Sequence, residues 1–274
     1  MSQTNSPSPG GGKTSFLDRA FRALSVAVAI VLCLFHLAAA SPLLVLNNTT
    51  QAVIHGALVV SFFLLARGLS FRGGKLIDIA MIVVTVLAAL AVIQMRNSNS
   101  ASATLYSAYQ QRISILFVVV ALIVGYRALG KILPSLCILF LGYTLLGRYL
   151  LGALATAKVT VTRFGTYLMV SSEGLFGNAL STAANYIFLF VIFGSVLSFI
   201  GAGEFFVDIA FSAFGRVRGG PAQAAVYSSM LMGMVNGSGA ANVVTTGTFT
   251  IPLMKRTGFD PDTAGAIEAV ASNG

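Results

Sequence analysis

The chain has 274 residues, of which 56% are hydrophobic and 9% charged, and 17 Lys and Arg against 8 Asp and Glu give a net charge of +9. A soluble domain carries roughly 25% charged residues, so the composition excludes a soluble enzyme and indicates a chain that lies mostly in lipid. The basic residues are scattered between apolar segments and do not gather on one face, so we expect contact with the lipid bilayer and no nucleic-acid partner.

The N-terminal segment is rich in Ser, Pro and Gly, which predicts a disordered cytoplasmic tail over residues 1–19. Six apolar segments follow, and at about 1.5 Å per helical residue they are candidates to cross roughly 30 Å of hydrocarbon, the fourth being the shortest. They cover residues 21–40, 52–69, 76–95, 113–126, 133–151 and 180–200. We therefore predict an all-α integral membrane protein, a multi-span helical bundle.

The distribution of basic residues predicts the orientation of the chain. Three lie at or before the start of the first segment and three between the second and third, whereas the loop at residues 41–51 has none. The six are Lys13, Arg19, Arg22, Arg67, Arg72 and Lys75. Because cytoplasmic loops are enriched in Lys and Arg, we expect the N-terminus in the cytoplasm.

Residues 203–215 combine acidic and aromatic side chains at helical spacing. Glu204 and Asp208 are four residues apart and so share one face, while the aromatic residues lie mostly away from them. This pattern predicts an amphipathic helix along the membrane interface. The alternative is a continuation of the sixth apolar segment.

Residues 222–251 are uncharged, but they do not resemble a simple membrane span. Arg216 and Arg218 precede the segment and Lys255 and Arg256 follow it, which favours cytoplasmic positions for both flanks. Two glycines at the centre disfavour one continuous helix. We predict a re-entrant hairpin of two half-helices, an arrangement that transporters use to bind ions and substrates.

The centre of this hairpin contains the candidate binding residues. Its uncharged oxygen atoms suit a hard cation such as Na⁺, and we expect Ser238 and Asn242 to be Na⁺ ligands. The other candidates are their neighbours in the chain: Asn236, Gly237, Gly239, Thr245 and Thr246. For any single Ser or Thr, the alternative is a hydrogen bond to its own helix or packing between helices.

Several stretches together resemble a known family. They are residues 171–177 (SSEGLFG), 201–206 (GAGEFF), 219–222 (GGPA), 236–243 (NGSGAANV), 245–255 (TTGTFTIPLMK), 264–269 (AGAIEA) and 271–274 (ASNG). They closely resemble the fused permease of tripartite ATP-independent periplasmic (TRAP) transporters, of the kind served by a TAXI-type periplasmic binding protein. The resemblance spans residues 164–274, whereas residues 1–160 agree only in hydropathy and position.

The resemblance implies an elevator-type secondary transporter of the bacterial inner membrane, with inverted repeats and Na⁺-coupled uptake of an organic anion. It implies no cofactor other than Na⁺ as coupling ion. Residues 20–160 would stand in for the small membrane subunit and 161–274 would begin the large one, with 222–251 as its first hairpin. The family usually has Ser-Thr-Gly-Gly where this chain has Ser272-Asn273-Gly274, so the resemblance adds Ser272 and Asn273 to the candidate site. The motif continues beyond this point in the family, so we expect the N-terminal portion of a longer permease.

Other residues are candidates for lesser roles. We expect His36 and His55 to be packing or interface residues, Arg148 to lie within the fifth span or to snorkel from its end, and Glu268 to pair with a basic group on the cytoplasmic side. Two other functions are possible. A non-transporting membrane anchor or assembly subunit is the first, and an intramembrane serine hydrolase built on Ser238 is the second. No His follows Ser238 in the chain, which argues against a catalytic triad and against an enzyme.

Overall fold

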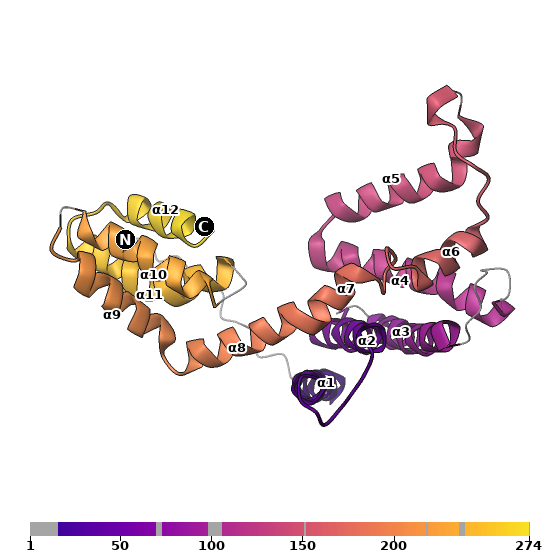
Figure 1. The fold of residues 1–274 in the computed structure, drawn as a ribbon, viewed down its shortest axis with the longest axis horizontal. Helices are drawn as coiled ribbons and strands as arrows, with labels where there is room; N and C mark the ends of the chain where they lie inside the picture. The colour runs from indigo at the N-terminus through magenta and orange to yellow at the C-terminus, as the bar shows by residue number, and fades with distance from the viewer. Residues whose placement is uncertain are drawn as a thin grey trace, which may run out of the picture. The chain divides into compact units, whose positions relative to one another are not determined.

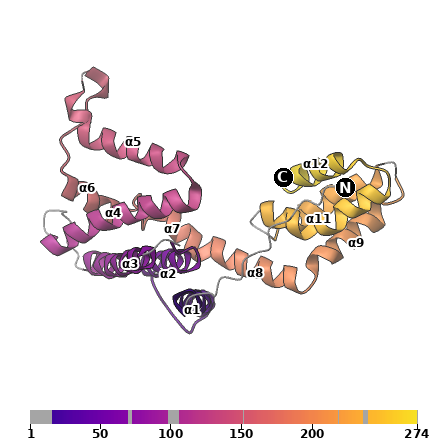
Figure 2. The same cartoon turned by 180° about the vertical axis from the view of Figure 1, so that it is seen from behind.

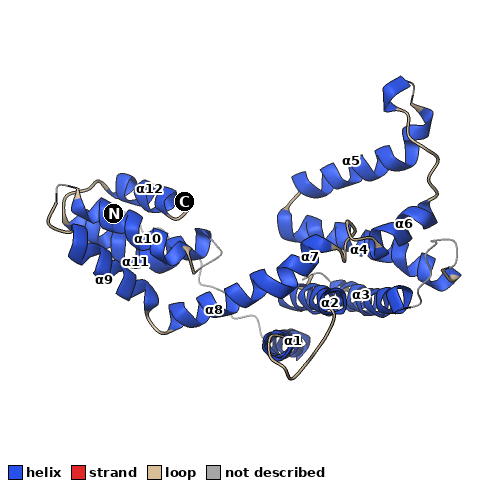
Figure 3. Cartoon of the chain, viewed as in Figure 1, coloured by secondary structure: helices blue, strands red, loops and turns tan. Residues whose placement is uncertain are grey.

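The computed structural model describes residues 16–69, 73–97, 106–150, 152–217, 219–235 and 239–273. Every regular element in these ranges is helical (Figure 3), which confirms the predicted all-α class. Residues 1–15 of the predicted tail lie outside the described ranges. The end of the tail at residue 19 is wrong, because α1 already begins at Phe16 and has Asp18 in its first turn, where a negative charge stabilises a helix.

Contacts divide the chain into two compact units, residues 1–181 and 182–274. The first unit contains α1 (Phe16–Ala39), α2 (Asn48–Ala66), α3 (Gly74–Asn97), α4 (Ala108–Leu129), α5 (Ile132–Leu146) and α6 (Val161–Val170), and α7 (Asn178–Thr182) lies at its end. By contacts α6 belongs with this unit, because it packs against α4. The subunit boundary expected at residue 160 rests on the family resemblance and stays a prediction.

Among the described residues, six helical segments are long and apolar enough to cross a membrane. They are Asp18–Ala39, Asn48–Ala66, Gly74–Arg96, Ala108–Leu129, Ile132–Tyr149 and Asn178–Phe199. Each overlaps one of the six predicted segments. Arg148 lies at the end of the fifth candidate span, as expected. It follows α5, which ends at Leu146, and its exposed guanidinium stacks over the Tyr149 ring in a short 3₁₀ turn.

The core of the first unit lies where α2, α3, α4 and α6 meet. Val53 of α2, Val92 of α3 and Met169 of α6 are fully buried there, together with Phe117 of α4 and Phe176 of the loop after α6. The Phe117 and Phe176 rings stack with their centroids 5.0 Å apart. Many other large apolar side chains of the first unit, for example on α1, are exposed, as expected for surfaces that face lipid.

Asp78 of α3 joins the ends of two neighbouring helices. Its carboxylate is fully buried and accepts hydrogen bonds from the backbone N–H of Leu69, at 2.6 Å, and from Arg127 Nη1, at 2.5 Å. Arg127 lies in the last turn of α4 and also donates to the backbone carbonyl of Arg67, which follows α2. One buried ion pair therefore fixes the positions of three helix ends.

His36 of α1 and His55 of α2 form a buried interhelical pair. His36 Nδ1 lies 2.9 Å from the carbonyl oxygen of Leu32, and His36 Nε2 lies 3.0 Å from His55 Nδ1. Because a carbonyl only accepts, His36 Nδ1 is the donor, and the Nε2 atom of the neutral ring accepts from His55. The two rings connect α1 to α2, which is the interface role expected of them.

The second unit begins with a π-helical turn (Ala183–Ile187), followed by α8 (Phe188–Phe199), α9 (Ala202–Phe214), α10 (Gly220–Gly233), α11 (Gly239–Arg256) and α12 (Pro261–Ala271). Helices α9, α11 and α12 all pack against α10 (Figures 1 and 2). The predicted helix at 203–215 is confirmed as α9, with Val207 and Ala210 buried. Its position along the membrane interface stays a prediction.

The predicted break in residues 222–251 is confirmed, because α10 ends at Gly233 and α11 begins at Gly239. Helix α10 has 14 residues and at about 1.5 Å per residue is roughly 21 Å long, shorter than the hydrocarbon core of a bilayer. It begins after Gly219, whose φ of 75° lies in the left-handed region that glycine favours. The two helices lie on either side of the predicted break, and their arrangement as a re-entrant hairpin stays a prediction.

Candidate functional site

A fully buried carboxylate, that of Glu268 in α12, lies at the centre of the second unit. Four hydroxyl groups surround it. Thr246 and Thr250 of α11 donate to Oε1 and Oε2, each at 2.5 Å. Ser229 of α10 and Ser272 after α12 donate to Oε1, at 3.0 and 3.2 Å. Three helices therefore converge on one acidic side chain, and we call this group of five residues the Glu268 cluster.

Helical spacing explains why these residues meet. Asn242, Thr246 and Thr250 are four residues apart along α11 and form one polar stripe, and Glu268 and Ser272 have the same spacing in α12. Between the helices lies Gly247, where a Cβ atom would be 3.1 Å from Glu268 Cγ. The missing side chain lets α12 approach α11 closely enough for the hydroxyls to reach the carboxylate.

The negative charge of the Glu268 cluster has no basic partner among the described residues. The ion pairs found in these ranges, Lys75–Asp18 and Arg127–Asp78, lie in the first unit. The expected pairing of Glu268 with a basic group is not found in the described ranges: Lys255 and Arg256 end α11 with exposed side chains, while Glu268 faces the polar stripe. A buried carboxylate without a counter-charge favours either a bound cation or a proton.

Asn242 adjoins this cluster and is 1% exposed. Its Nδ2 atom donates to the backbone carbonyl of Ser229 at 2.9 Å, and its backbone carbonyl lies 2.9 Å from the Thr246 hydroxyl. Its side-chain oxygen Oδ1 is buried and has no hydrogen-bond partner in the part of the chain that the structure describes. An unpartnered buried acceptor costs about 1–3 kcal/mol, so this atom fits a cation ligand, which is the role predicted for Asn242.

The other predicted site residues divide into three groups. Asn236, Gly237 and Ser238 lie outside the described residues, so their roles stay predictions. Thr246 and Ser272 belong to the Glu268 cluster.

The third group lies beside the cluster. Gly239 begins α11, and a Cβ atom there would be 2.9 Å from Asn273 Oδ1 and 3.0 Å from the backbone oxygen of Ser272. The exposed Asn273 donates from Nδ2 to the carbonyl of Ala269 at 3.0 Å. Thr245 is turned toward α9, because its methyl group is 2.6 Å from the Cβ position of Gly203. The start of α11 thus lies against the end of α12.

Three residues of the Glu268 cluster were not among the binding residues predicted from sequence: Glu268 itself, Ser229 and Thr250. The signal that points to Thr250 is the four-residue spacing from Asn242 through Thr246. No local pattern links Ser229 to Glu268, which are 39 residues apart in the chain. No group of three or more His, Cys, Asp or Glu able to hold a metal occurs among the described residues, so a cation here would have one carboxylate, that of Glu268, together with hydroxyl and amide oxygens.

Comparison with known proteins agrees with this architecture. Residues 115–274 match the family described as "Tripartite ATP-independent periplasmic transporter, DctM component". A relative from Sinorhizobium fredii (strain NBRC 101917 / NGR234), the "Uncharacterized protein y4mL", is 30% identical over 122 residues, which are 44% of this chain and 29% of the relative. The chain thus covers less than a third of that relative's length. No solved structure matches this chain.

The family match covers more than half of the chain, including all of the second unit. It contains the Glu268 cluster and both half-helices, and the segments long enough to cross a membrane extend on its N-terminal side as well. The family consists of transporter components and not of enzymes, which agrees with the prediction that this chain is not an enzyme. The chain belongs to the DctM family and is a multi-pass membrane permease component of a TRAP transporter.

Proposed function

We propose that this chain is part of a permease that couples Na⁺ entry to the uptake of an organic anion. A periplasmic binding protein of the TAXI type delivers the anion, and the permease lies in the bacterial inner membrane with its N-terminus in the cytoplasm. Family membership supports a periplasmic binding protein as partner. The TAXI type rests on the sequence motifs, and the orientation rests on the loop charges.

The observation that carries Na⁺ coupling is a pair of buried groups that lack a partner among the described residues: an oxygen without a donor and a carboxylate without a counter-charge. Asn242 Oδ1 supplies the first and Glu268 the second, and Ser229 is hydrogen-bonded to both residues. Oxygen atoms are the ligands that hard cations prefer, and one positive charge would offset that of the carboxylate. Asn242 would be a ligand of the ion, together with Ser238 as the sequence predicts.

Replacing Asn242 by Ala tests this proposal in the full-length permease, reconstituted with its binding protein and substrate. Removing one oxygen ligand should raise the Na⁺ concentration for half-maximal uptake by roughly ten- to a hundredfold, because the loss is worth about 1–3 kcal/mol. The control is Thr248→Ala in the same helix, since among the described residues the exposed Thr248 hydroxyl bonds only to the carbonyl of Thr245. If both variants keep the wild-type Na⁺ dependence, Asn242 is a packing residue and the site assignment fails.

A further inference from the structure

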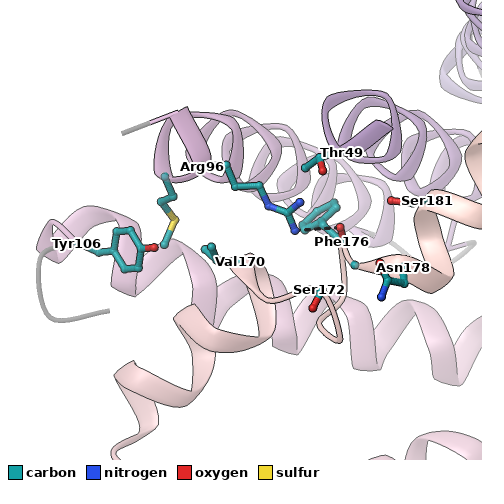
Figure 4. A pocket seen from close by; sticks show the side chains of 10 residues that line it. Thr49, Arg96, Tyr106, Val170, Ser172, Phe176, Asn178 and Ser181 are labelled. Carbon is teal, nitrogen blue, oxygen red and sulfur yellow. Dashed lines mark hydrogen bonds between the residues drawn. The ribbon is translucent and has the colours of Figure 1, made fainter. Parts of the chain in front are cut away.

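A second polar site lies in the first unit, in a cavity of about 350 Å³ at the start of α2 and the end of α3 (Figure 4). Arg96 and the side chains of Thr49, Ser172, Asn178 and Ser181 line it, with Phe176. Arg96 lies in the last turn of a candidate membrane span and Thr49 in the first turn of another. Side chains at span ends lie at the level of the lipid headgroups.

The loop between α6 and α7 forms a rigid wall of this cavity. The backbone N–H of Leu175 donates to the carbonyl of Leu168 at 2.6 Å, and that of Asn178 donates to the carbonyl of Ser172 at 2.7 Å. At Gly177, a Cβ atom would be 2.0 Å from the carbonyl oxygen of Ser172, so only glycine permits this conformation. The hydrogen bonds and the glycine therefore fix the conformation of this loop, and with it one wall of the cavity.

The positive charge of Arg96 is unpaired within the described residues. Its Nη2 atom donates to the backbone carbonyl of Phe176 at 3.1 Å, while its Nε atom is buried without a partner. The sequence has no acidic residue between Asp78 and Glu173. Glu173 accepts a hydrogen bond from Asn178 Nδ2 at 3.2 Å and forms no ion pair with Arg96. A partly buried guanidinium that has no carboxylate partner favours the binding of an anion from outside the chain.

The hydroxyls in the cavity are also available to a ligand. The side chains of Thr49, Ser172 and Ser181 make no hydrogen bond within the part of the chain that the structure describes. In Figure 4, Ser172 and Asn178 lie on the same side of the cavity as the Phe176 carbonyl that Arg96 contacts. Hydroxyl and amide donors beside a guanidinium match the acceptor oxygens of an oxyanion.

We propose that this cavity binds the phosphate group of a phospholipid headgroup. Its position at the ends of two apolar spans places it where lipid phosphates lie, and its volume is that of a small-molecule site. The neighbouring Met95 and Val170 give the cavity an apolar side toward which the glycerol and acyl chains can extend. This site is independent of the Na⁺ coupling proposed for the second unit.

Native mass spectrometry of the purified chain in detergent tests the proposal with phosphatidylglycerol and with diacylglycerol of the same acyl chains. Wild-type protein should retain phosphatidylglycerol and not diacylglycerol. Arg96→Gln should weaken the lipid adduct about ten- to a hundredfold, since hydrogen bonds to charged groups are the strong ones. The matched control is Arg112→Gln, because Arg112 lies in the second turn of α4, is exposed and does not line the cavity.

If Arg96→Gln does not fold, Ser172→Ala should show a smaller loss of the same adduct, because Ser172 makes no side-chain bond in the structure that would hold the loop. A parallel titration with inorganic phosphate distinguishes the source of the oxyanion. Binding of phosphate in place of the lipid would show a free-anion site and overturn the lipid assignment. Equal retention of phosphatidylglycerol by wild type and both cavity variants would overturn the site altogether.

Discussion

Glu268 and Asp78 are both buried carboxylates, but their hydrogen-bond donors differ. Asp78 has a guanidinium partner, whereas Glu268 has hydroxyl donors from three segments. Hydroxyls can rotate, so they stabilise a carboxylate without fixing its charge: each can donate to the carboxylate or turn to another acceptor. Thr246 and Thr250 have such alternatives in the carbonyls of Asn242 and Thr246. The cluster is thus built to tolerate a change of charge on Glu268.

Replacing Glu268 by Gln removes the charge while keeping the shape, and the hydroxyls can turn to accept from the new amide. The full-length permease should therefore still fold, but the Na⁺ concentration for half-maximal uptake should rise on the order of ten- to a hundredfold. Uptake by reconstituted vesicles at varied Na⁺ measures this. Glu173→Gln is the control, since Glu173 is exposed in the first unit. An unchanged Na⁺ dependence of Glu268→Gln would mean that the carboxylate does not act on the cation.

In the first unit, a buried ion pair connects the ends of three helices. Asp78 connects α3 to the last turn of α4 and to the chain just after α2, and Arg127 continues this link to the carbonyl of Arg67. The carboxylate is 0% and the Arg127 side chain 14% exposed. Because the pair is buried, losing one partner leaves a charge without compensation in a medium of low dielectric.

Asp78→Asn should therefore destabilise the first unit by about 3–5 kcal/mol, the usual cost of breaking a buried pair. The matched control is Lys75→Gln, whose pair with Asp18 is more exposed, at 22% and 46%, and should cost at most about 1 kcal/mol. Thermal unfolding of the detergent-solubilised chain compares the two. Equal shifts for both variants would contradict the view that burial gives the Asp78–Arg127 pair its importance.

At the scale of the whole molecule, the helices that are long and apolar enough to cross a membrane differ from α10, the first helix of the predicted hairpin. The candidate spans have 18 to 23 residues and apolar outer surfaces, whereas α10 has 14 residues and turns Ser229 toward the buried Glu268 cluster. A helix of that length does not reach across the bilayer. Both ends of the hairpin should accordingly lie on the cytoplasmic side.

Single cysteines test this topology after Cys33 and Cys137 are replaced by Ala. Cysteines at the exposed Arg216 and Arg256 should both resist a membrane-impermeant thiol reagent added from the periplasm, because the predicted hairpin has both of its flanks in the cytoplasm. A cysteine at Leu43, 85% exposed in the loop after α1, should react and serves as positive control. Labelling of only one of the two hairpin positions would show a simple span in place of the re-entrant hairpin.

Prediction from sequence worked best where the signal is local. Hydropathy located the six long helices, and the glycines between Asn236 and Ala240 located the break between α10 and α11. The spacing of Glu204 and Asp208 located α9. Helix boundaries were less exact: α4 begins at Ala108, five residues before the expected start, since the capping box of Ser107 and Gln110 starts the helix in a polar segment.

Sequence alone determined the helical class, the number of long apolar helices, the break between α10 and α11, and the motifs of the family. All of these depend on residue type and on spacing within a few helical turns. Only the tertiary structure decided which polar groups meet: Ser229 with Glu268 across 39 residues, and Arg96 with the carbonyl of Phe176 across 80. Such contacts depend on how each helix is rotated and how closely it approaches its neighbours, here through the missing side chain of Gly247. No local pattern encodes that geometry, because packing over the whole unit sets it.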